Sequence, residues 1–154
     1  MSTIKVDTYL TRGGASEIAI DKLKGVTAAG SMLVVGEGGT VTTNLQQGLA
    51  KHWMRLDGSG TVSLLDSFNA SGLTDGGSGK YTPAFTNNMS NANYSVQLTA
   101  SVDHDVDYFF AFFGDESGQY PPPTTSAYTT NNGGSGGGVG DTDGVCGTVN
   151  GDLA

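Results

Sequence analysis

The chain has 154 residues, enough for one ordinary domain or for a small domain plus an arm. It carries a net charge of −8, and all seven basic residues lie in residues 1–80 together with seven acidic ones, whereas residues 81–154 hold eight acidic residues and no basic one. Nucleic-acid and anionic-membrane binding need clustered Lys and Arg, so both partner classes are excluded. The acidic half is expected to provide solubility and repel like charge, with a divalent-cation site as the alternative.

The single cysteine, Cys146, excludes an intrachain disulfide framework. It lies in the alternating run 145–149, where we expect a small buried thiol rather than a nucleophile. Residues 1–5 do not resemble a secretory leader, and the longest apolar run, 108–113, is too short to span a bilayer. We therefore expect the protein to be made and kept in a cytoplasm before it reaches its final place.

Residues 1–45 predict an N-terminal arm or a small β subdomain with a docking role. The segments 4–6 and 40–43 are strand-like, 32–35 is a short apolar run, and 18–20 is either a strand or one helical turn. Glycines interrupt these segments and leave little room for an independent core. Such a segment is most stable when it lies against another surface, its own or a neighbour's.

Residues 46–154 predict one antiparallel β-sandwich or jelly-roll-like domain, because short alternating runs are separated by glycine-rich turns. In the first of these runs Ala50, His52, Met54 and Leu56 share one face. Pro83 indicates an edge or bulge position in its strand. The expected strands are 49–56, 61–68, 80–86 and 94–102, and the expected turns are 57–60 and 74–79.

The carboxyl-terminal part is less regular. The aromatic run 108–113 predicts a buried strand, and the three prolines at 121–123 must be extended. Residues 131–144 predict a glycine-serine loop that is mobile or ordered only against a partner. Residues 145–153 predict a last strand that closes the sheet.

The chain offers no convincing catalytic, cofactor-binding or metal-ligand set. His52 lies mid-strand beside Trp53, which favours a packed or interface residue over a general base. His104 lies within the segment from Asp103 to Asp107, whose alternating aspartates could bind Ca²⁺ but lack the glycine and distal glutamate of an EF-hand loop. The segment from Asp141 to Asp143 has the same weakness, and one cysteine with two distant histidines makes a zinc site improbable.

Other candidate chemistry is also weak. The glycine runs 36–39 and 133–138 lack the Lys-Ser/Thr pair and the helix of a phosphate loop. Tyr120 and Tyr128 could stack on sugars, although we favour packing around Pro121. We therefore expect a protein that is not an enzyme and that needs no cofactor.

One long stretch, 42–96, resembles a domain of phage virion proteins, especially the tail-fibre and head-fibre proteins of marine phages. Trp53 belongs to the resemblance, and so does the ending GDLA at 151–154. The other matching segments read TTNLQQGLAK at 42–51, DGSG at 57–60, DSFN at 66–69, SGLTD at 71–75, GSGKYT at 77–82 and MSNANYSV at 89–96.

The resemblance implies a turn-rich β domain in a virion structural part, usually a homotrimer. The roughly 45 residues before the domain are too few for a fibre shaft and adequate for a capsid-docking arm. We therefore expect a capsid decoration, cement or head-fibre protein on the capsid surface, with the major capsid protein or another virion protein as partner. The alternative is a short tail-fibre component that binds a host surface receptor or glycan.

Overall fold

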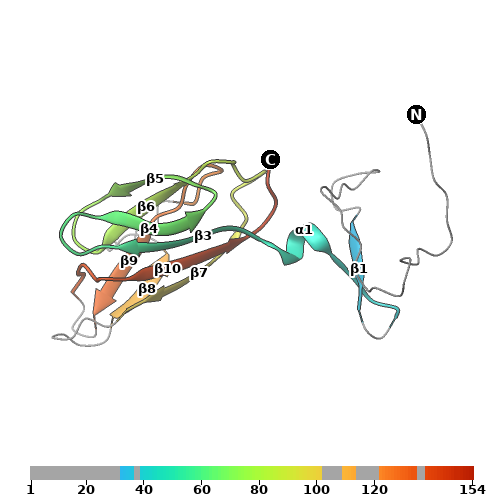
Figure 1. Ribbon diagram of the computed structural model, residues 1–154, viewed down its shortest axis with the longest axis horizontal. Helices are drawn as coiled ribbons and strands as arrows, with labels where there is room; N and C mark the ends of the chain where they lie inside the picture. Colours follow the sequence, from blue (N-terminus) through green and yellow to red (C-terminus); the bar gives the residue numbers. More distant parts are fainter. Residues whose placement is uncertain (1–31, 37–38, 102–108, 114–121, 135–137) are drawn as a thin grey trace, which may run out of the picture.

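A computed structural model describes residues 32–36, 39–101, 109–113, 122–134 and 138–154 (Figure 1). These residues form a short β-hairpin, a one-turn helix and two four-stranded antiparallel sheets. The predicted all-β sandwich is confirmed. The predicted segments 4–6 and 18–20 lie outside the described residues.

The hairpin pairs β1 (Leu33–Val35) with β2 (Thr42–Asn44). The helix α1 (Leu45–Gly48) follows at once, because the Asn44 side chain accepts hydrogen bonds from the backbone N–H groups of Gln46 at 2.8 Å and Gln47 at 3.3 Å. Such a side-chain oxygen satisfies N–H groups that have no partner inside the helix. Figure 1 shows α1 joining the hairpin to the sandwich.

Each layer of the sandwich is one sheet, and a single residue, Asn69, carries the chain from β4 in the first to β5 in the second. Asn69 has a φ of 58°, a left-handed conformation that Asn tolerates better than most residues. Its side chain donates to the Lys51 and Asn87 carbonyls at 2.9 and 3.1 Å and accepts from the Asn87 N–H at 2.7 Å. The first sheet has the order β4 (Ser63–Phe68), β3 (Ala50–Asp57), β10 (Val145–Asn150), β7 (Ser95–Ala100), and the second has the order β5 (Ala70–Asp75), β6 (Lys80–Phe85), β9 (Thr130–Gly134), β8 (Phe109–Phe113).

The core lies between the sheets and follows from strand alternation. His52, Met54 and Leu56 point inward from β3 as expected, whereas Ala50 is exposed. Burying each large side chain stabilises the fold by roughly 1.5–3 kcal/mol. The buried hydrophobic residues are Met54, Leu56, Tyr81, Phe85, Met89, Tyr128, Val145 and Val149.

Both predicted turns are present. In the first, Asp57 accepts from the Ser59 N–H at 2.8 Å, and Gly60 has a φ of 59°. In the second, Asp75 accepts from the Gly77 N–H at 2.8 Å, and Gly77 has a φ of 99°. These are the local bonds and the positive φ values for which tight turns select Asp and Gly.

The expected loop 131–144 is wrong over its first part, because β9 is a strand between β6 and β8. Asn131 and Asn132 are buried. Backbone pairing with β6 and β8 keeps β9 extended, so the strand forms without an alternating apolar pattern. The strand β5 is also absent from the expected elements, because Ser71 and Gly72 resemble turn residues and pairing with β6 holds them extended.

Two further positions differ from the expectation. The expected last strand is present as β10, but it ends at Asn150 rather than at residue 153 and lies between β3 and β7. Pro83 does not lie on an edge strand, because β6 has β5 on one side and β9 on the other. The β6–β9 pairing covers only Lys80 and Tyr81 and ends before Pro83, which has no N–H to donate.

Candidate functional site

The exposed apolar side chains gather in two places. The described part of the chain has nine large exposed hydrophobic residues. Seven of them lie in these two places, Leu49 lies in the connection between the places, and Leu153 lies elsewhere. We call the first place the hairpin surface and the second the sheet surface. The hairpin surface comprises Leu33, Val34, Val35 and Val41, and the sheet surface comprises Trp53, Leu65 and Phe68.

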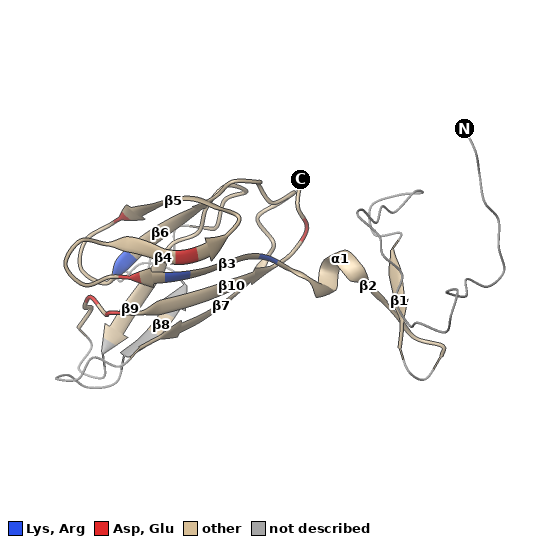
Figure 2. Ribbon diagram, viewed as in Figure 1, with Lys and Arg blue, Asp and Glu red and all other residues tan. Residues whose placement is uncertain are grey.

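The hairpin surface has apolar side chains on both faces. Strand register places Leu33 and Val35 on one face and Val34 and Val41 on the other. Their exposed fractions run from 50 % at Val34 to 74 % at Val41. The described residues 32–36 and 39–49 include no charged residue, and Figure 2 shows this part of the chain without acidic or basic colour. An isolated two-stranded hairpin is marginally stable in water, so apolar contacts from outside the hairpin would stabilise this ribbon.

The sheet surface lies on the outer face of the first sheet. Trp53 on β3 is the cross-strand partner of Phe68 on β4, and the two are 39 % and 50 % exposed. Leu65, 52 % exposed, lies at the bulge in β4. The next row of the same face carries Arg55 beside Asp66. An aromatic pair flanked by charged residues is typical of the centre and rim of a protein–protein contact.

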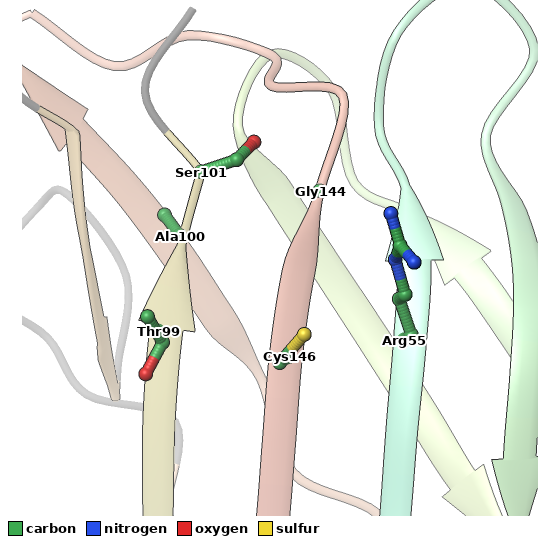
Figure 3. A pocket seen from close by; sticks show the side chains of 6 residues that line it. All are labelled: Arg55, Thr99, Ala100, Ser101, Gly144 and Cys146. Carbon is green, nitrogen blue, oxygen red and sulfur yellow. The ribbon is translucent and has the colours of Figure 1, made fainter.

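A shallow groove of about 290 Å³ adjoins the sheet surface (Figure 3). Cys146 is exposed there, so the expected burial of its thiol is wrong. Its neighbours Val145 and Gly147 point into the core, and strand alternation therefore turns Cys146 outward. The groove is lined by Arg55, Thr99, Ala100, Ser101, Gly144 and Cys146, a set without a histidine or a carboxylate that could activate the thiol.

His52 is a core residue, as predicted. Its ring packs edge-on against Phe85 and Tyr128, with centroids 5.1 and 5.7 Å away. Its Nδ1 lies 3.4 Å from the Asn69 carbonyl oxygen, and its Nε2 has no hydrogen-bond partner among the described atoms. Burial lowers the pKa of His52, against a smaller opposing effect of the Asn69 and Phe68 backbone. A neutral imidazole closed off by aromatic rings cannot serve as a general base.

The carboxylates of the segment from Asp141 to Asp143 hold loops in place. Asp141 accepts from the Gly79 N–H at 2.7 Å and from the Tyr81 hydroxyl at 2.9 Å, and Asp143 accepts from the Ser101 hydroxyl at 2.5 Å. Burial raises the pKa of Tyr81, and Asp141 raises it further. Within the described residues, no three His, Cys, Asp or Glu side chains gather as a metal site would require. The other candidate segment, Asp103 to Asp107 with His104, lies outside them.

Tyr128 cannot stack on a sugar, because it is 2 % exposed. It packs against His52 and Phe85 in the core, and burial raises its pKa. Tyr128 is therefore packed, as favoured over stacking, and the rings that it contacts belong to the core. Tyr120 and Pro121 lie outside the described residues.

The sequence contained signals for both apolar surfaces. The run 32–35 is apolar at consecutive positions, and Trp53 lies opposite the inward face of β3. What the sequence lacked was the pairing of Trp53 with Phe68, which depends on strand register.

None of the helices in the described part of the chain has the length and hydropathy to cross a bilayer. Comparisons of the chain with models of protein families, with curated proteins and with solved structures found no match.

Proposed function

We propose that this protein is a phage virion structural protein, a capsid decoration, cement or head-fibre protein that forms homotrimers and attaches to the shell through residues 1–45. The all-β sandwich supports the proposal, since it is the architecture that the resemblance implies. The observation that carries the self-association in this proposal is the hairpin surface. Four apolar side chains on this projecting ribbon are each 50–74 % exposed. Such a ribbon is suited to contact with another molecule.

The function is mechanical in this proposal. Apolar area removed from water between subunits and against the shell contributes roughly 25 cal/mol per Å² before the costs of association. A protein that binds only the assembled shell shifts the assembly equilibrium toward that shell by mass action. No catalytic group or cofactor is needed for this activity.

The test uses particles that lack the protein, with and without purified protein added back. We expect added protein to raise the temperature at which the particles release their genome. Equal release temperatures contradict the cement activity. A matched control is protein that has been heat-unfolded and cooled, which carries the same composition without the folded surfaces.

The position on the particle separates this proposal from the alternative, a short tail-fibre component that reads a host glycan. Antibody labelling spread over the head supports a decoration or head-fibre protein, and labelling confined to the tail tip supports the alternative. Burial of Tyr128 removes one of the two aromatic side chains that favoured glycan stacking. The capsid surface is therefore the location we propose.

A further inference from the structure

The hairpin surface and the sheet surface belong to one chain, and neither is covered by the residues that the structure describes. A foreign partner that covered one surface would leave the other in water. A second copy of the chain can cover both, because each copy carries one surface of each kind. The question is then whether the hairpin can reach the sheet surface of its own sandwich.

The connection between the two is held by hydrogen bonds. Lys51 is 6 % exposed, and its ammonium group donates to the Gln46 carbonyl and, at 2.8 Å, to the Leu49 carbonyl. Gln47 donates to the Asp152 carboxylate at 2.5 Å, which ties α1 to the end of the chain. Asn44 caps the same helix. These contacts fix α1 on the sandwich, and Figure 1 shows the hairpin held beyond it, away from the sheet.

We propose that the hairpin surface of one copy packs on the sheet surface of a second copy. The contact is heterologous, so every copy both gives a hairpin and receives one, and a rotation of one third of a turn closes three copies into a ring. This inference rests on the self-association in the proposed function and not on the location in a virion. It names the two surfaces that make the contact.

The chemistry of the two surfaces agrees with this pairing. The described hairpin residues are uncharged, so burying their side chains places none of them as an ionised group in a low-dielectric contact; Glu37, between the two strands in the sequence, lies outside the described residues. Both surfaces have an apolar centre. On the hairpin it consists of Val34 and Val41 on one face, and on the sheet it consists of the Trp53–Phe68 pair. Arg55 and Asp66 lie beside the aromatic pair, where they form a polar rim.

The experiment is disulfide cross-linking between two full-length variants in a Cys146→Ser background. One variant carries Val34→Cys and the other Phe68→Cys, and the two are mixed, unfolded, refolded together and oxidised. All substituted side chains are exposed, so the sandwich is expected to fold. The control pair replaces Phe68→Cys with Thr74→Cys, an exposed position on the edge strand of the other sheet.

We expect cross-linked dimer of the Val34/Phe68 pair to exceed that of the Val34/Thr74 pair roughly tenfold or more, because a specific contact raises the effective concentration of the two thiols. Equal yields from both pairs overturn the proposed contact. If the chain is an oligomer by mass and yields remain equal, the contact is wrong and the virion proposal stands. If the chain is a monomer at all concentrations, the homotrimer is wrong as well.

Discussion

The buried imidazole of His52 makes the stability of the sandwich dependent on pH. Burial lowers the pKa of this residue in the folded chain below its ordinary value of about 6.5. Below that pH the unfolded chain binds a proton at His52, whereas the folded chain does not bind it until the pH falls further. The contribution to stability is therefore complete above about pH 6.5 and is lost as the pH falls below it.

The magnitude follows from one proton. The free energy of unfolding falls by at most about 1.4 kcal/mol per pH unit while only the unfolded state is protonated. A proton on Nε2 has no acceptor among the described atoms, and the opposing effect of the Asn69 and Phe68 backbone on the pKa is smaller than that of burial. Since a typical domain has 5–15 kcal/mol of stability, a loss of this size is readily measured.

The assay is urea unfolding between pH 7.5 and 5.5 for the natural chain and for His52→Phe. Phe keeps a ring between Phe85 and Tyr128 and has no proton to bind. The Asn69 carbonyl still accepts from the Thr86 N–H at 3.1 Å, so this acceptor keeps a partner in the variant. We expect its stability at pH 7.5 to lie within about 1 kcal/mol of the natural chain and its pH slope to be smaller. An unchanged slope refutes the assignment to His52, and a His104→Gln variant serves as the control.

Three further predictions concern the packing of turns and the connection to the hairpin. Gly58→Ala is expected to lower the free energy of unfolding by at least about 1–3 kcal/mol, because the added Cβ would lie 2.0 Å from the buried Tyr81 hydroxyl oxygen. Gly48→Ala is the control, because its added Cβ meets nothing within 4 Å. Equal urea midpoints of the two variants contradict this packing. Asp141→Ala removes the acceptor of two hydrogen bonds and is expected to lower stability by about 1.5–3 kcal/mol, while EDTA leaves the melting temperature of the natural chain unchanged. A drop in melting temperature with EDTA would instead indicate a bound cation. Lys51→Met removes the two bonds to the Gln46 and Leu49 carbonyls, so amide hydrogen exchange in α1 should accelerate while exchange in β3 and β10 stays slow. Unchanged exchange in α1 would show that Lys51 does not hold the connection.

Much of the sandwich was predictable from local pattern. The strand β3 alternates between buried and exposed residues from His52 to Leu56, and its flanking turn carries Asp57 and Gly60 where side-chain bonding and positive φ require them. Elements held only by their neighbours were not predictable in this way. The strand β9 is a run of polar residues and glycine, and it is ordered because it pairs with β6 and β8.

The candidate surfaces show the same division. The glycines that interrupt residues 1–45 indicated that this segment is most stable against another surface, because they leave little room for an independent core. The sheet surface depends on which β4 residue faces Trp53, and the bulge in β4 sets that register. The exposure of Cys146 likewise depends on the parity of β10, which a five-residue pattern does not fix.

The most direct measurement uses Trp53, the single tryptophan of the chain, which lies at the centre of the proposed contact. Its side chain is 39 % exposed in one copy and is expected to lose that contact with water on assembly. Its emission is followed over a dilution series alongside the mass in solution, for the natural chain and for a Val34→Asp, Val41→Asp variant. For the natural chain, the predicted result is a trimer that dissociates on dilution while the Trp53 emission shifts to longer wavelength. The variant is expected to be monomeric even at concentrations at least roughly tenfold above those at which the natural chain dissociates. A natural chain that stays monomeric, or a trimer whose Trp53 emission matches that of the variant, would contradict the account.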